Sequence, residues 1–503
     1  MPSIKSYSIL GKLFGLGEYK VSHENAFHGS AAYALATIEY VAMNAHPKIS
    51  FSKTMETRPD FIMGHLLLAT SQTFAPLHIQ DIMDARKRLV ISTELLREDR
   101  AISERLHVGA LEATLDGKLQ EAAALYESIL AHDPIDLLAL RCCYDVYLKL
   151  GDGHNVLGTI ARRVPFWSPK IPGYSLLLSM QAFGLHICGK MDEAEKMAEK
   201  ALALNGNDRW AFFTLLQVLE TRGNPNHGAS FALQHRELFD TEGHIQGRLY
   251  FHWALYLFGL GRYDHILRMI QNDMIPSSQT TSYSPQTLRY VTQLYWRLKF
   301  ADENVTQLHS QLTKAWLSTL NQFTDKEWRL LSPLDRIHCH SICSKESNHE
   351  HLDFTHFHQI DTFALEEKFG VKIQPFSFSM PSDAQVLTQL TQEVCLAFED
   401  YNHQKYDEAT RRLLRFRGRF HHLGESNAEN DLFDLLLMDS ASRGSDLSLA
   451  RLLVNERICC KSQNAQEWKT SSRVFKSMGD EASVRDAESM SYVLGLGQQG
   501  NTM

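Results

Sequence analysis

The chain has 503 residues, of which 44% are hydrophobic and 22% are charged, and its formal net charge at pH 7 is −8. This composition is typical of a globular protein with material for a large core, and the spread negative charge argues against nucleic acid or an anionic membrane as a partner. No run of about 18 apolar residues occurs that could span a bilayer, and the eight cysteines have no disulfide-framework spacing. We therefore expect a soluble, cytoplasmic protein with reduced thiols.

The first segment, residues 1–102, has helical patterning. Pro59 precedes the apolar run FIMGHLLLA (residues 61–69), and residues 80–96 carry apolar positions at helical spacing among charges. We expect irregular helices here, ahead of the repeats.

Residues 103–280 contain a repeated helix–turn–helix pattern. The windows 103–136, 175–208 and 247–280 each carry a turn glycine followed by small and large apolar residues at tetratricopeptide spacing. Five turn glycines follow one another at intervals of 34, 38, 34 and 38 residues, which composition alone would not produce: Gly117, Gly151, Gly189, Gly223 and Gly261. The pattern predicts paired helices with one of these glycines at each turn.

The remaining chain is also predicted to be helical. Residues 281–370 form a helical segment with a histidine-rich stretch, residues 386–490 form a C-terminal helical repeat segment, and the Pro- and Ser-bearing Val371–Gln385 is interpreted as the connector between them. Ser426 and Glu429 have capping-box spacing before an apolar run, which predicts a helix start. The expected fold is all-α: a tetratricopeptide-like helical-repeat solenoid with irregular helical segments at both ends.

Four stretches together resemble the tetratricopeptide repeat protein 38 family. They are PDFIMGHLLLA (59–69), the stretch from Val164 to Trp210, HWALYLFGLGRYDHIL (252–267) and GESNAENDLF (424–433). The resemblance runs from about Pro59 to Leu453. It implies a helical-repeat protein, and because the family's biochemical role is poorly defined, it implies little about function.

The chain departs from the family pattern at two places. On the helix FTLLQVLE, Gln217 and Leu219 stand where the family tends to carry histidines, and Glu220 matches. Residues 424–430 read GESNAEN where the family has Gly-Gly-Ser-Asn-Ala-Gln-Arg. The chain is therefore identified as a diverged member of this family.

The stretch 338–358 is rich in histidine, with six histidines and two cysteines. If it is helical, His349, Asp353 and His356 share one face that a metal could use. No Cys-x-x-Cys or His-Glu-x-x-His spacing accompanies them, so these three residues are weak metal candidates only. We predict neither a metal nor any other cofactor.

The only concentrated basic run is RRLLRFRGRFHH, residues 411–422, in which Phe416 and Phe420 alternate with cations. Such a pattern could serve single-stranded nucleic acid. However, Leu413 and Phe416 fall at core positions of a repeat, and carboxylates stand nearby. We expect a charged outer helix face paired with those carboxylates, and no nucleic-acid partner.

The inner positions of the repeat helices are apolar and aromatic. They predict a concave groove that captures a partner helix or an apolar ligand, because the Lys, Arg and Asn of a carboxylate clamp are missing. The groove could equally be filled by the chain's own terminal helices. The predicted lining residues are Met180, Phe183, Trp210, Phe213, Gln217, Phe251, His252 and Leu255.

These observations favour a cytosolic binding or scaffolding protein whose partner is a protein or an apolar small molecule. The alternative is an enzyme or small-ligand binder with a pocket around His252, Trp210 and Phe213. No catalytic residue is assigned, because no nucleophile can be placed beside His252.

Overall fold

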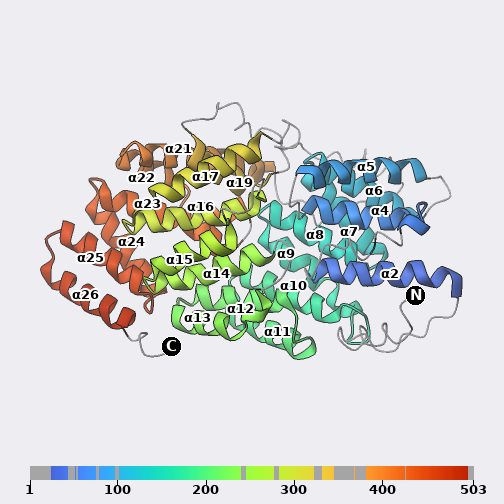
Figure 1. Cartoon of the computed structure of the whole chain (residues 1–503), viewed down its shortest axis with the longest axis horizontal. Coiled ribbons are helices and arrows are strands. Elements are labelled where there is room, and N and C mark those ends of the chain that lie inside the picture. Colours follow the sequence, from blue (N-terminus) through green and yellow to red (C-terminus); the bar gives the residue numbers. More distant parts are fainter. Residues whose placement is uncertain are drawn as a thin grey trace. The chain divides into compact units, whose positions relative to one another are not determined.

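The structure is a computed structural model of the chain (Figure 1). All of its regular elements within the described residues are helices, which confirms the all-α prediction. The described residues are 24–42, 51, 55–74, 79–96, 101–239, 245–276, 283–321, 331–344, 368, 381–424 and 426–496.

The chain forms two compact units, and the division falls inside α12 (Arg209–Thr221), between Leu215 and Leu216. The predicted division into four segments is not tested by these two units and stays a prediction. Its first boundary lies close to the start of α6 at Ile102.

The first unit stacks its helices in consecutive pairs. Helix α4 packs on α5, α6 on α7, α8 on α9 and α10 on α11, while α7 and α8, and α9 and α10, join one pair to the next. The helices are α2 (Glu24–Val41), α4 (Ile62–Phe74), α5 (Ile79–Leu95), α6 (Ile102–Leu115), α7 (Leu119–His132), α8 (Leu137–Lys149), α9 (Gly153–Ala161), α10 (Tyr174–Ile187) and α11 (Met191–Leu204), with the 3-10 turn η1 (Val164–Phe166) before α10.

The second unit also packs helices against their neighbours in the sequence. Helix α16 packs on α14, α17, α19 and α23, so it lies at the centre of this unit. The helices are α13 (Pro225–Gln234), α14 (Ile245–Gly259), α15 (Tyr263–Met269), α16 (Pro285–Phe300), α17 (Thr306–Leu320), α19 (Pro333–Cys343), α21 (Pro381–Asn402), α22 (Tyr406–Leu414), α23 (Asn427–Arg443), α24 (Leu447–Cys460), α25 (Ala465–Ser477) and α26 (Glu481–Leu496). Short helical turns are η2 (Arg236–Leu238), η3 (Ile270–Met274) and η6 (Phe420–Leu423).

The predicted turn glycines all lie between paired helices, and all have positive φ. This confirms the register, because a left-handed residue ends one helix and glycine adopts that conformation without the steric cost of a Cβ. The φ values are 74° at Gly117, 69° at Gly151, 78° at Gly189, 67° at Gly223 and 70° at Gly261.

Two turns of the second unit use the same backbone conformation without glycine. Asp302, with φ 61°, follows α16, and Gln404, with φ 60°, follows α21. These helix pairs therefore have the same turn geometry as the predicted repeats, although their sequences lack the glycine that marks it.

The predicted helix start at Ser426 is confirmed. Its hydroxyl accepts from the backbone N–H of Glu429, whose carboxylate accepts in turn from the backbone N–H of Ser426. The boundary of the predicted connector differs, because α21 begins at Pro381, and proline is well tolerated in the first turn of a helix. Residues 371–380 of that connector lie outside the described residues.

Candidate functional site

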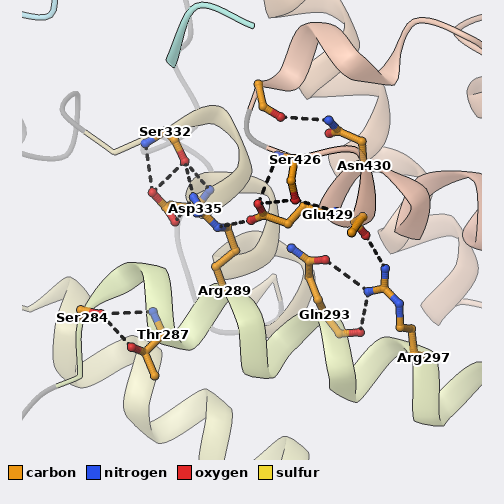
Figure 2. Close-up of polar contacts among 12 residues, drawn as sticks. Ser284, Thr287, Arg289, Gln293, Arg297, Ser332, Asp335, Ser426, Glu429 and Asn430 are labelled. Atoms are coloured by element: carbon orange, nitrogen blue, oxygen red, sulfur yellow. Dashed lines mark hydrogen bonds and ion pairs between the residues drawn. The ribbon is translucent and has the colours of Figure 1, made fainter. Parts of the chain in front are cut away.

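A buried arginine on α16 holds the first turns of two other helices in the second unit (Figure 2). Helices α19 and α23 both begin with a capping box, Ser332 with Asp335 and Ser426 with Glu429. Both capping carboxylates also pair with Arg289, whose side chain is almost fully buried (Figure 2). The distances are 2.9 Å from Nη1 to Asp335 Oδ1 and 3.0 Å from Nε to Glu429 Oε1. One guanidinium therefore fixes two helix N-termini.

A second arginine of α16 anchors the same end of α23. The Nη2 of Arg297 donates to the carbonyl oxygen of Ala428 at 2.8 Å, and its Nη1 donates to Gln293 on its own helix (Figure 2). Burial lowers the pKa of Arg297 to about 10, so it stays cationic at neutral pH. Helix α23 is thus held rigidly on α16.

Beyond these anchors, α23 and α24 border a cleft of about 490 Å³, together with the turn after α22. We call it the charged cleft. Its ionisable lining residues are Arg417, Asp431, Asp434, Glu456, Arg457 and Lys461, and its other lining residues are Gly418, Met438, Leu453 and Cys460.

The two innermost cations of the charged cleft are tied to carboxylates. Arg457 lies 2.9 Å from Asp431 and binds Glu467 through two hydrogen bonds of 2.8 and 2.6 Å. Lys461 lies 2.7 Å from Glu220 and 3.5 Å from Asp431. Both cations are mostly buried, and the bidentate pairing with Glu467 fixes the guanidinium of Arg457 in one orientation.

The two carboxyl groups that α23 contributes to the cleft lining differ in pKa. Burial alone would raise the pKa of Asp431, but Arg457 and Lys461 beside it hold that pKa well below its usual value. Burial, and then the negative charge of Asp431, raise the pKa of Asp434 to about 6. Within the described part of the chain Asp434 makes no direct hydrogen bond or ion pair, and the charges of Arg457 and Arg417 offset only part of the effect of burial and of Asp431 on its pKa.

The position of Lys461 depends on a close approach of two backbones. Gly223, in the turn between α12 and α13, lies against it, and a Cβ at residue 223 would come within 2.7 Å of the Lys461 Cα. Glycine is therefore required here both for its φ of 67° and for space.

The eight side chains predicted to line an aromatic groove are all buried. Their exposed fractions are at most 8%: Met180, Phe183, Trp210, Phe213, Gln217, Phe251, His252 and Leu255. The first four belong to the first unit and the last four to the second. A partner could touch them only if the covering elements moved, so the groove stays a prediction.

In the first unit, the N-terminal helix α2 covers part of this predicted lining. Arg141 of α8 donates to the carbonyl oxygen of Val41 at 3.1 Å, and its guanidinium lies 4.1 Å from the ring centroid of Trp210. Trp210 also meets Tyr144 and Phe183 edge-on, with centroids 5.5 and 6.1 Å apart. We call Tyr144, Phe183, Trp210 and Phe213 the aromatic cluster; its geometry is that of a core.

The weak metal candidates His349, Asp353 and His356 lie outside the described residues. Nearer the start of the histidine-rich stretch, His340 is 2.7 Å from Glu399, and His338 is fully buried beside the ring of Phe433. Among the residues that the structure describes, no group of three or more His, Cys, Asp or Glu side chains is placed to hold a metal ion.

The basic run 411–422 has the predicted arrangement. Arg412 pairs with Glu393 at 2.8 Å and with Asp400 at 2.7 Å, and Phe416 and Phe420 are buried. The rings are thus packed inside, where they could not stack on nucleotide bases.

No protein-family model matches the chain. Among solved structures, the chain is similar to one described as Naa15/Naa10 bound to HypK-THB, at 13% sequence identity over 94% of this chain and 64% of that chain, with a TM-score of 0.23. The chain thus spans less than two thirds of the length of that structure's chain, and a TM-score this low carries no argument about function. None of the described helices is long and apolar enough to cross a membrane.

Sequence reasoning missed the charged cleft. Two features pointed toward it: carboxyl groups at i and i+3 (Asp431 and Asp434) and cations at i and i+4 (Arg457 and Lys461) on successive predicted helices. The pairing of Lys461 with Glu220, which is remote in sequence, was not readable from spacing.

Proposed function

We propose that this chain is a helical-repeat binding protein that holds a protein partner in the charged cleft. The observation that carries the proposal is a cleft between helices anchored by buried arginines, which contains both fixed ion pairs and a carboxylate, Asp434, whose charge is only partly compensated. Ionised groups that burial and hydrogen bonds already hold in place need little reorganisation when a ligand binds, which favours specific binding.

The anchoring of the cleft supports this proposal. Arg289 and Arg297 fix the first turn of α23, and Arg457 ties α24 to both α23 and α25. Buried ion pairs often stabilise a fold less well than apolar side chains of similar volume would, which fits a role of this network in binding.

The resemblance to the tetratricopeptide repeat protein 38 family is part of the proposal. Glu220, which matches the family pattern, binds Lys461 beside the cleft. The stretch 424–433 contains Glu429, which binds Arg289, and Asp431, which lines the cleft. One of the four stretches that carry the resemblance, 424–433, therefore contributes to this site, together with the matching residue Glu220.

We also propose that the protein works in the cytosol. All eight cysteines are free thiols, which fits a reducing compartment.

The aromatic groove and the alternative enzyme pocket around His252, Trp210 and Phe213 are less well supported than the charged cleft. All three side chains are at most 2% exposed, and aromatic side chains buried to this extent stabilise the fold by packing.

A pair of adjacent cysteines allows a matched test of the cleft. Cys460 lines the cleft and Cys459 does not, and both are exposed, so Cys460→Trp should fill the cleft while Cys459→Trp leaves it open. Affinity capture from a cell lysate should enrich a set of proteins with wild type and with Cys459→Trp, and this set should be lost with Cys460→Trp. Identical captured sets for all three folded proteins would contradict the proposal.

A further inference from the structure

The two innermost cations of the charged cleft already have carboxylate partners. Arg457 and Lys461 are surrounded by three carboxylates, those of Asp431, Glu467 and Glu220. Each cation already makes two ion pairs, so a ligand anion would have to displace a buried carboxylate to reach either of them. The interior of the cleft is therefore unsuited to an anionic ligand.

The remaining ion pair lies at the exposed part of the cleft. Arg417 of the turn after α22 pairs with Glu456 of α24, and their side chains are 39% and 59% exposed. Ion pairs as exposed as this contribute little stability, since water competes for both partners. Glu456 can therefore exchange Arg417 for a ligand cation at small cost.

Within the described residues, Asp434 makes no direct hydrogen bond or ion pair, although the charges of Arg457 and Arg417 act on it. It stands one turn along α23 from Asp431, whose charge disfavours a second carboxylate beside it. The pKa of Asp434 is raised to about 6 because burial and the charge of Asp431 outweigh the charges of Arg457 and Arg417. A ligand cation beside Asp434 would stabilise its carboxylate further.

The apolar residues of the lining favour a ligand that has an aliphatic part beside its cation. Met438 follows Asp434 by one turn of α23, and Leu453 contributes from α24; both side chains are mostly buried. A ligand that combines a terminal cation with a flexible aliphatic stem would meet Asp434 at one end and these two side chains along its length. A volume of about 490 Å³ is ample for one such side chain.

We propose that the charged cleft receives a lysine side chain of the partner protein, with its ammonium group on Asp434 and its methylenes along Met438 and Leu453. This inference rests on the proposed function of the same cleft. The ammonium group, a compact charge on a flexible stem, can turn its three N–H donors toward both Asp434 and Glu456.

The test is a selection from a random peptide library with the full-length chain. Wild type should enrich peptides with lysine at one fixed position, and replacing that lysine by norleucine or acetyl-lysine should weaken binding about tenfold or more, as expected for a charge-assisted hydrogen bond. Asp434→Asn should abolish the enrichment. The control Asp486→Asn, at an exposed aspartate of α26 away from the cleft lining, should leave it unchanged.

The outcomes separate this inference from the proposed function. If the selected peptides no longer bind Cys460→Trp but tolerate norleucine at every position, the cleft remains the binding site and the lysine assignment is overturned. Enrichment of acidic or phosphorylated residues would overturn the lysine assignment in the same way. Peptides that bind Cys460→Trp as well as wild type, or failure to select any peptide, would contradict both proposals.

Discussion

The aromatic cluster of the first unit and the charged cleft of the second show two uses of paired helices. In the aromatic cluster every ring is buried, and the nearby cation, Arg141, is itself covered by α2. In the charged cleft the cations are tied down by carboxylates, yet Asp434 and Glu456 still line an open cavity. Apolar inner positions of a repeat therefore indicate packing, whereas we propose that the ionised side chains that share the cleft form a surface for a ligand.

The largest expected effect comes from removing the cation that joins two helix starts. Arg289→Leu would leave Asp335 and Glu429 buried without their counterion, and we expect a loss of about 5 kcal/mol of unfolding free energy, at the upper end for broken buried pairs. Denaturant unfolding followed by circular dichroism measures it. Arg412→Leu, at a partly exposed pair, is the matched control and should cost about 1 kcal/mol or less.

The next effect tests whether the aromatic cluster is core. Trp210→Ala should cost about 3–4 kcal/mol, because it removes a fully buried ring from between Tyr144, Phe183 and Arg141. The same unfolding measurement applies. A variant that melts like wild type but loses its partner would show instead that Trp210 lines a binding groove.

The turns offer a smaller and more local test. Gly189→Val should cost about 1–3 kcal/mol, since residue 189 has φ 78° and a Cβ there meets no other atom within 4 Å, so the cost is in the backbone alone. The reverse change, Gln404→Gly, should stabilise by about 0.5–1 kcal/mol at the same backbone conformation. Equal stability of Gly189→Val and wild type would contradict the account of these turns.

The smallest effect concerns pH and the buried histidine of α19. Burial, followed by the charges of Arg289 and Arg297, holds the pKa of His338 well below 6.5. The unfolded chain therefore takes up a proton below pH 6.5 that the folded chain does not, and stability falls by up to about 1.4 kcal/mol per pH unit. His338→Leu should flatten this dependence between pH 7.5 and 5.5, whereas the exposed His154→Leu should leave it as in wild type.

The sequence was informative where a feature is local. The glycines from Gly117 to Gly261 and the Ser426 capping box are set by the conformation of a few neighbouring residues, so their spacing predicts turns and a helix start correctly. The turns at Asp302 and Gln404 have the same backbone but no glycine, because the steric cost of one left-handed residue is small enough for packing to offset.

The candidate site could not be predicted in the same way. Inner positions were read correctly as apolar, but whether Trp210 is open or covered depends on α2, a helix distant in sequence. Likewise, Glu220 and Lys461 meet only because Gly223 lets two distant turns touch. Such contacts follow from tertiary packing and not from residue spacing.

The most direct test of the central claim is amide hydrogen exchange on the full-length chain, alone and with a captured partner. Binding in the charged cleft predicts added protection in residues 431–438 of α23 and 453–460 of α24, with no change in residues 180–186 and 209–215 around the aromatic cluster. Protection confined to residues 180–186 and 209–215, with α23 and α24 unchanged, would contradict the claim.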